Sequence, residues 1–228
     1  MLMKAVCLLS SGLDSLASLA IASAKYDVQI GLTFDYGQLA ADAEIDHSRQ
    51  ICAHYGIPHR VISLDWMKDI TTTSLVNRQG CLPDMAGADL GKREVTSESA
   101  ANVWVPNRNG LMANIAASFA EALGCGYIVA GFNAEEAATF PDNSPEFVDC
   151  INRAFSYSTL NGVRLISPVL EMDKVAIVKE AVRAQAPLGL SWSCYQGKEK
   201  PCGLCESCVR RARAFQKAGV QDPAVEDI

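Results

Sequence analysis

The sequence lacks any apolar run that approaches the roughly 20 residues of a transmembrane helix. Its first residues, MLMKAVCLL, have no basic leader and no small-residue cleavage site of the kind found in secretory signals. We therefore expect a cytoplasmic protein without a membrane anchor. Basic residues are also in deficit, because 20 Lys and Arg stand against 26 Asp and Glu, a net charge of −6. Phosphate backbones are bound mainly by clustered Lys and Arg, so no stable nucleic-acid complex is expected.

Two common nucleotide-binding motifs are absent as well. The sequence contains neither G-x-x-x-x-G-K-[ST] nor G-x-G-x-x-G, which excludes a Walker-type loop and the usual dinucleotide fingerprint. Histidine is scarce, with three in the whole chain, all at one expected helix and its exit. Without matching carboxylates or cysteines beside them, His47, His54 and His59 are interpreted as surface or packing residues.

What the chain does contain is an alternation of short apolar strands with amphipathic segments. The pattern predicts strands at 5–9, 28–34, 60–64 and 127–131, and helices at 14–25, 39–55, 110–123, 145–158 and 173–185. Strands rich in Val, Ile and Leu with intervening helices are typical of a parallel sheet covered on both faces. We expect a doubly wound, mostly parallel, Rossmann-like α/β fold.

The 228 residues contain no obvious polar linker, so we expect one core with appendages. Residues 1–185 form the predicted nucleotide-binding α/β domain, and residues 186–228 a small C-terminal metal-binding segment packed on it. Between about 68 and 105 the periodicity fades, and we interpret this stretch as a mobile loop or lid.

The turn after the first strand is a strong functional signal. The strand KAVCLL leads directly into Ser10–Ser15 (SSGLDS) and then into a helix of small and apolar residues. Free N–H groups at a helix N-terminus bind anions, and Gly12 lets the backbone approach a ligand closely. Serine hydroxyls that only cap the helix are the alternative. The loop resembles the S-G-G-x-D-S signature of the pyrophosphate-loop ATP pyrophosphatases, whose fold is adenine nucleotide alpha hydrolase-like, with Ser11 where Gly is usual. The resemblance implies binding of ATP with Mg²⁺.

Four of the nine cysteines lie close together near the C-terminus, in the pattern C-x7-C-x2-C-x2-C. Such spacing fits a tetrahedral four-thiolate Zn²⁺ site, and because all four ligand positions are filled by sulfur the site should be structural. An iron–sulfur cluster or four unrelated thiols are the alternatives, but the spacing matches neither ferredoxin pattern. The expected ligands are Cys194, Cys202, Cys205 and Cys208. The other five cysteines are interpreted as small core residues.

Several motifs together resemble the 7-cyano-7-deazaguanine synthase family along nearly the whole chain. They are SSGLDS, TFDYGQ at 33–38, VPNRN at 105–109, FPDNSPEF at 140–147 and SCYQGKEKPCGLCESC at 193–208. The resemblance implies conversion of 7-carboxy-7-deazaguanine with ammonia and ATP into the nitrile, by way of an activated acid and an amide. It also implies a homodimer.

The resemblance carries site roles onto residues of this chain. Expected catalytic residues are Asp14, Arg108 and Lys174. Expected nucleotide-binding residues are Leu8, Leu9, Ser10, Ser11, Gly12, Leu13, Asp14, Ser15, Leu16, Ala17, Ser18, Asp35 and Tyr36. Expected substrate-binding residues are Gln38, Arg108, Asn109, Asp142 and Glu146.

Most of these side chains also have ordinary structural explanations. Tyr36 can pack at a strand end, Arg108 and Lys174 can be exposed cations, and Asp142 and Glu146 suit the positive end of a helix dipole. The chain departs from the family pattern at Asn107, where Gly is common, and at 143–144, where Asn-Ser replaces a Cys-Arg pair.

Two other functions remain open at this stage. One is a related pyrophosphate-loop enzyme that modifies tRNA or amidates another carboxylate. A basic RNA-binding face and a catalytic cysteine pair would mark the tRNA enzyme, and Cys81 is its one candidate outside the cluster. The other is a nucleotide-sensing or metal-stabilised interaction domain that binds ATP without turnover.

Overall fold

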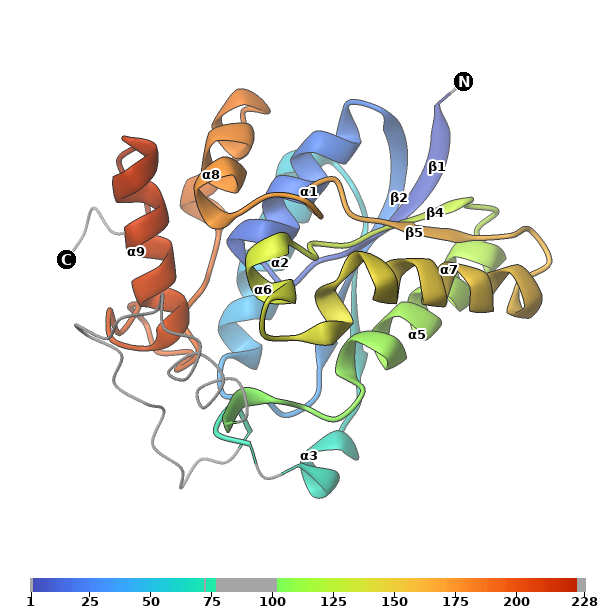
Figure 1. The fold of residues 1–228 in the computed structure, drawn as a ribbon, viewed down its shortest axis with the longest axis horizontal. Coiled ribbons are helices and arrows are strands. Elements are labelled where there is room, and N and C mark those ends of the chain that lie inside the picture. Colours follow the sequence, from blue (N-terminus) through green and yellow to red (C-terminus); the bar gives the residue numbers. More distant parts are fainter. Residues whose placement is uncertain (1, 72, 77–101, 225–228) are drawn as a thin grey trace.

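The computed structural model describes residues 2–71, 73–76 and 102–224. Its centre is a five-stranded sheet with the order β3-β2-β1-β4-β5, in which every neighbouring pair is parallel (Figure 1). The strands are β1 (Met3–Leu8), β2 (Tyr26–Asp35), β3 (His59–Ser63), β4 (Tyr127–Val129) and β5 (Arg164–Ile166). The prediction of a doubly wound parallel sheet is confirmed.

The strand order identifies where a ligand binds in such a fold. The chain runs outward from β1 to β3 and then returns to the other side of β1 with β4 and β5. The order therefore reverses between β1 and β4, and doubly wound sheets bind ligands outside the carboxyl ends of the strands at that reversal. The loop after β1 lies at this position.

Helices cover both faces of the sheet. The helices α1 (Leu13–Ser23), α2 (Ala41–Tyr55), α8 (Lys174–Arg183) and α9 (Glu206–Ala218) contribute to one apolar cluster, and α5 (Arg108–Ala122) and α7 (Pro145–Ser158) contribute to the other. Alternation along β1 divides its side chains between the two, with Val6 in the α5 and α7 cluster and Ala5 and Cys7 in the other.

The remaining elements are short. They are α3 (Met67–Ile70), α6 (Ala134–Ala137) and the 3₁₀ turns η1 (Pro141–Asn143) and η2 (Leu188–Leu190). The sequence pattern did not predict β5, since a three-residue strand carries almost no periodicity. Most of the expected loop at 68–105, with Cys81, lies outside the described residues. No helix in the described ranges combines the length and apolarity that a bilayer crossing requires.

Two helices begin at capping residues that can be recognised in the sequence. Asp173 caps α8 by accepting from Ala176 N at 2.8 Å, as expected. Ser144 caps α7 by accepting from Phe147 N at 3.1 Å, with proline at the first position of the helix. One expectation about the thiols is wrong: Cys150 is exposed on α7 rather than in the core, whereas Cys7, Cys52 and Cys125 are buried.

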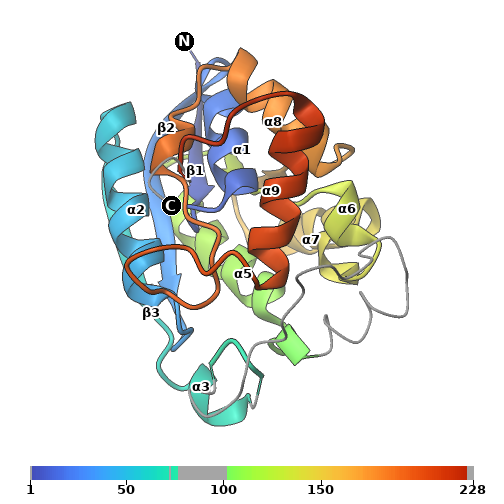
Figure 2. The same cartoon turned by 90° about the vertical axis from the view of Figure 1, so that its left-hand side faces the viewer.

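The C-terminal segment shares the core of the α/β domain. Phe215 of α9 is 2% exposed and packs in the same cluster as α1 and α8. Arg211, also buried, pairs through two nitrogens with the carboxylate of Asp222 at 2.6 and 2.8 Å. Figure 2 shows α9 beside α8, with the connection between them running past α2. A division at residue 185 stays a prediction, which unfolding experiments can test.

Truncation of Phe215 tests whether the C-terminal segment unfolds together with the sheet. We expect Phe215→Ala to lower the free energy of unfolding by about 3–5 kcal/mol, because it leaves a cavity in a shared core. Urea unfolding followed by far-UV circular dichroism should show one transition at a lower midpoint. The control is Tyr157→Ala, an 84% exposed residue on α7, with an expected change within about 0.5 kcal/mol. A separate early transition with an unchanged main one would show two independent units.

Candidate active site

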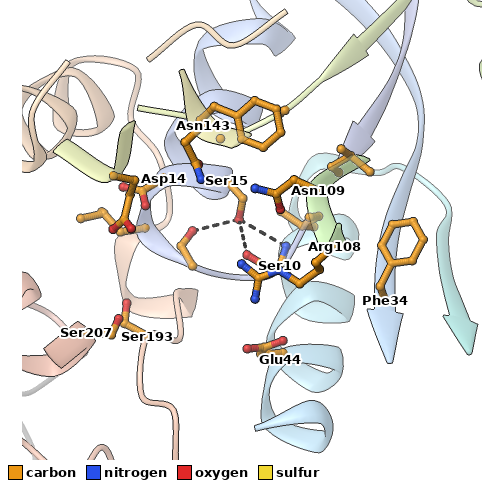
Figure 3. A pocket seen from close by; sticks show the side chains of 18 of the residues that line it. Ser10, Asp14, Ser15, Phe34, Glu44, Arg108, Asn109, Asn143, Ser193 and Ser207 are labelled. Atoms are coloured by element: carbon orange, nitrogen blue, oxygen red, sulfur yellow. Dashed lines mark hydrogen bonds between the residues drawn. The ribbon is translucent and has the colours of Figure 1, made fainter. Parts of the chain in front are cut away.

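A cavity of about 290 Å³ opens at the carboxyl ends of β1, β2 and β4 (Figure 3). Its walls come from the loop after β1, the end of β2, the first turns of α2, α5 and α8, the segment after β4, and the chain around the cysteine cluster. The cavity therefore coincides with the reversal point of the sheet. Polar and charged residues that line it include Ser10, Asp14, Ser15, Gln38, Glu44, Arg108, Asn109, Asn133, Glu136, Asn143, Lys174, Arg210 and Arg211.

The loop after β1 is organised around the hydroxyl of Ser15. Ser15 Oγ donates to the carbonyl of Gly12 at 3.0 Å, accepts from Ser10 N at 3.3 Å and lies 3.3 Å from Ser10 Oγ. Gly12 is the N-cap of α1, and no side chain of the described residues caps this helix. The serines thus shape the loop rather than cap α1, which is the arrangement expected of an anion-binding turn.

Ser11 holds the loop in a strained backbone conformation. Its φ is +58°, a region that favours glycine, and its carbonyl accepts from Trp192 N at 3.0 Å. Its hydroxyl donates back to the carbonyl of Ser10 at 2.6 Å. The hydrogen bond from Trp192 joins the loop to the segment that carries the cysteines.

Gly131, which the sequence analysis did not identify, brings the end of β4 against the loop. A Cβ atom placed there would lie 2.7 Å from Ser15 N and 2.9 Å from the carbonyl carbon of Asp14. Only glycine permits this approach of two backbones. The β4 segment can therefore form the second wall of the site.

Lys174 is the centre of a partly buried ion network. Its Nζ lies 2.6 Å from Asp14 Oδ2 and 2.9 Å from Glu136 Oε1, with 12% of its side chain exposed. Its backbone N–H donates to Glu135 Oε2 at 3.2 Å. Glu135 in turn pairs with Arg210 of α9 at 2.5 Å. Four elements that are distant in sequence meet here.

The charges of this network shift the pKa values of its members. Burial alone would lower the pKa of Lys174, but Asp14 and Glu136 outweigh it and hold the ammonium well above its usual range. Burial raises the pKa of Asp14, an effect that Lys174 only partly offsets. For Glu136, burial works upward but Lys174 prevails and lowers the pKa. Lys174 is thus a fixed cation.

Two buried polar atoms in this wall have no hydrogen-bond partner among the described residues. They are Asp14 Oδ1 and Asn133 Nδ2, and both residues line the cavity. Asn133 is fully buried, and its Oδ1 accepts from Glu136 N at the start of α6. An unpartnered buried acceptor and donor, in residues that line the cavity, are of the chemical types that bind a cation and an anionic oxygen respectively. The donor set therefore fits a phosphate group with a metal ion.

Arg108 forms the opposite wall. Its Nη1 donates to the hydroxyl of Tyr36 at 3.0 Å, and its guanidinium carbon lies 5.7 Å from the centre of that ring. The ring is 6% exposed and packs in the core, so Tyr36 supports Arg108 as well as the cavity wall. Asn107, with φ +52°, turns the chain into α5, and asparagine tolerates that region better than most residues. Asn109 donates to the carbonyl of Asp142 at 3.2 Å.

Gln38 and Glu44 complete the wall beside Arg108. The Gln38 side chain accepts from Tyr36 N at 2.9 Å and donates to the carbonyl of Phe34 at 2.9 Å and to Glu44 Oε2 at 2.8 Å. Gln38 therefore holds the turn after β2. The sequence analysis did not identify Glu44, which lies one turn into α2 where an acidic residue is unremarkable.

The structure does not bring every expected residue to the cavity. Asp35 accepts from Gly37 N in the turn after β2, and Glu146 is exposed on α7. Asp142 contributes its carbonyl to Asn109, whereas its neighbour Asn143 lines the cavity. The expected residues outside the lining are Ser11, Leu16, Ala17, Ser18, Asp35, Asp142 and Glu146. Their ligand roles remain predictions.

The four cysteines of the C-terminal segment form one cluster. The sulfur atoms of Cys194, Cys202, Cys205 and Cys208 all lie within 4.8 Å of one another. Backbone N–H groups point at two of them: Gln196 and Cys202 donate to Cys194 Sγ at 3.4 and 3.3 Å, and Cys205 donates to Cys202 Sγ at 3.3 Å. Convergent sulfurs with N–H donors suit thiolates around a metal ion.

The cysteine segment is packed tightly on the site. The indole of Trp192 donates to the carbonyl of Cys194 at 2.8 Å, and its ring lies 5.2 Å from that of His47 on α2. A Cβ at Gly197 would lie 2.4 Å from the carbonyl of Leu39. The cysteine segment thus contacts both the loop after β1, through Trp192 N and Ser11 O, and the turn after β2.

Comparison with known proteins identifies relatives along almost the entire chain. A family model described as "Queuosine biosynthesis protein QueC" matches residues 4–219. A 7-cyano-7-deazaguanine synthase of Methanosarcina barkeri is 58% identical over 227 residues, which cover 98% of each chain. The enzyme of the same name from Methanosarcina mazei is 56% identical with the same coverage. That of Carboxydothermus hydrogenoformans is 52% identical, over 92% of this chain and 97% of its own.

Removal of the Lys174 ammonium tests the ion network. We expect Lys174→Met to cost about 3–5 kcal/mol at neutral pH, because it leaves buried carboxylates without a counter-ion. Lys174 lowers the pKa of Glu136, so this contribution is present above the unfolded pKa of a glutamate and is lost as the pH falls. The deficit should therefore narrow toward about pH 4, where the unpaired carboxylates accept protons.

Urea midpoints of both proteins from neutral to acid pH measure this effect. The matched control is Lys179→Met, which removes an exposed lysine of the same helix and should leave stability within about 0.5 kcal/mol. An equal deficit at every pH would mean that lost packing, not charge, explains the cost.

Proposed function

The chain belongs to the family of the queuosine biosynthesis protein QueC, and we propose that it converts 7-carboxy-7-deazaguanine, ammonia and ATP into 7-cyano-7-deazaguanine. The observation that carries the proposal is the chain's 58% and 56% sequence identity, over nearly its full length, with two synthases of that name. The protein is an enzyme of this family that acts on small molecules. Its cavity is lined by cations and hydroxyl groups of the kinds that suit phosphate and carboxylate groups.

The chemistry explains why the site combines cations with a phosphate loop. A carboxylate is a poor electrophile, so its oxygen must first become a leaving group. Transfer of a phosphoryl-containing group from ATP does this twice, once before amide formation and once before the amide is dehydrated to the nitrile. Preorganised N–H donors and fixed cations stabilise the charge that develops on the transferred group.

We assign roles to residues that line the cavity. Ser10–Ser15 bind the ATP phosphates, and Asp14, whose Oδ1 has no hydrogen-bond partner among the described residues, would hold Mg²⁺, which would neutralise phosphate charge. Lys174 fixes the other oxygen of Asp14 and so orients it. Arg108 and Asn109 bind the substrate on the opposite wall, where a guanidinium suits its carboxylate. The resemblance of the loop to the pyrophosphate-loop ATP pyrophosphatases favours AMP over ADP as the product.

We propose that the cysteine cluster holds one structural Zn²⁺ per chain. Four thiolates leave no ligand position open for a water molecule, so the ion contributes folding energy rather than chemistry. Because Trp192 N donates to the carbonyl of Ser11, an ordered cluster also fixes the phosphate loop.

We further propose that the protein acts in the cytoplasm as a homodimer. Reduced thiols, which the metal cluster requires, persist in that compartment. The homodimer rests on the family resemblance alone, and size-exclusion chromatography with light scattering measures it directly.

The proposed reaction is tested with the purified, zinc-replete protein. Incubation with ATP, Mg²⁺, ammonium and 7-carboxy-7-deazaguanine should yield the amide and then the nitrile by mass spectrometry, with AMP as the nucleotide product. ATP binding without substrate-dependent turnover would contradict the proposal and direct attention to Asn143, which lines the cavity where the family has a different residue.

The metal assignment is tested by Cys202→Ser. We expect this variant to lose its zinc, measured by elemental analysis, and to bind ATP at least about 10-fold more weakly, because the Ser11 loop loses its anchor. The matched control is Cys150→Ser, which removes an exposed thiol outside the cluster and should keep both zinc and ATP affinity. Full ATP affinity in a zinc-free Cys202→Ser protein would show that the two sites are not coupled.

A further inference from the structure

One carboxylate in the cavity has no role in the scheme above. Glu44 lies in the first turn of α2 and lines the cavity together with Arg108, Gln38 and Ala40. In Figure 3 its carboxylate lies in the same hollow as Ser10 and Arg108, across from Asn109 and Asn143. It comes from the β2 side of the site, whereas the carboxylates of the Lys174 network come from the opposite side.

The contacts of Glu44 leave one oxygen available. Oε2 accepts from Gln38 Nε2 at 2.8 Å, and within the described ranges Oε1 has no hydrogen-bond partner. Gln38 is itself fixed by Tyr36 N and by the carbonyl of Phe34. The carboxylate is therefore held in place by a rigid amide while one of its oxygens faces the cavity.

The charged and titratable groups around Glu44 come from two elements. Arg108, at the start of α5, favours the ionised form, and Asp35, at the end of β2, disfavours it. Tyr36 lies behind Arg108 and is neutral, because burial raises its pKa. Burial of Glu44 has the largest effect and raises its pKa to about 7, although the hydrogen bond from Gln38 and the charge of Arg108 oppose it. No ion pair of Glu44 is present in the described structure, unlike the paired acids around Lys174.

We propose that Glu44 is the catalytic base that binds the ammonia-derived nitrogen and removes its protons. The inference rests on the proposed function, since the reaction has a nitrogen nucleophile only if the chain is a synthase of this type. A carboxylate held by one amide, with a free oxygen in the cavity beside an arginine suited to the substrate carboxylate, has the geometry for this role.

Glu44 takes a proton from bound ammonium and passes it to water. The nitrogen then attacks the activated acyl carbon, and the phosphoryl-containing group leaves with the former carboxylate oxygen and the electron pair of the broken C–O bond. Glu44 takes the second proton from nitrogen, which gives the amide. In the second half-reaction the amide oxygen receives the phosphoryl-containing group from a second ATP. Loss of the remaining N–H protons then forms the carbon–nitrogen triple bond as that group departs. Every proton released comes from nitrogen, so one base next to the nitrogen serves both halves.

The test compares wild type, Glu44→Gln and the control Asp42→Asn, an exposed acid in the same first turn of α2. Glutamine keeps the acceptor for Gln38 and removes the base. With ammonium as nucleophile, Glu44→Gln should lower kcat by about 100-fold or more. With hydroxylamine, which is uncharged at neutral pH and needs no deprotonation before it attacks, the loss of hydroxamate formation should be at least about 10-fold smaller. Asp42→Asn should match wild type with both nucleophiles.

The pH dependence provides a second measurement. Glu44→Gln can use only the free ammonia in solution, whereas the wild type can deprotonate bound ammonium. The wild-type advantage should therefore be greatest at acid to neutral pH and shrink as the pH rises above about 7, where free ammonia becomes more abundant. Equal losses with ammonium and hydroxylamine would assign Glu44 a positioning role and overturn the proposal. An unchanged ammonium rate would overturn it too, whereas a wild-type protein that forms no amide would instead refute the proposed function.

Discussion

The pairing of Lys174 with Asp14 is the interaction on which the arrangement of the site depends. It joins residues 160 positions apart and fixes the start of α8 to the start of α1. Glu136 adds the segment after β4 to the same cation, and Glu135 extends the network to Arg210 of α9. Because breaking a buried pair leaves an uncompensated charge, these elements keep one relative position. The loop after β1, the segment after β4 and the cysteine segment are all positioned through it.

A buried network of this kind is a cost as well as a constraint, since desolvation of its charges is unfavourable. The ion network lies where the strand order of the sheet reverses, which is the region in which doubly wound proteins bind ligands. The other wall is built differently: Tyr36, Gln38 and Arg108 support one another through hydrogen bonds to neutral groups. On one side of the cavity, Lys174 is thus paired with carboxylates of opposite charge. On the other side lies the carboxylate of Glu44, whose pKa is raised to about 7.

The sequence predicted the sheet, the turn from β1 into α1 and the cysteine cluster, because each depends on contiguous residues with a local physical reason. It did not reveal Glu44, Asn133 or Gly131, whose importance depends on tertiary placement. An acid in a first helical turn and a glycine after a strand are common, and nothing in their neighbours distinguishes them. Lys174 and Asp14 can each be predicted as functional residues from family resemblance. Their contact with each other becomes visible only in the folded structure.

Ser11 gives this site a property that glycine at that position would not provide. In the left-handed region a serine costs about 1–2 kcal/mol relative to glycine in the folded loop. It also has far fewer conformations available than glycine in the unfolded chain, and in the folded loop the hydrogen bonds of its carbonyl and hydroxyl select one of them. If the loop binds a triphosphate as proposed, the ligand meets a loop already in its binding shape. Less of the binding free energy is then lost in ordering the chain, and more of it remains for discrimination between nucleotides.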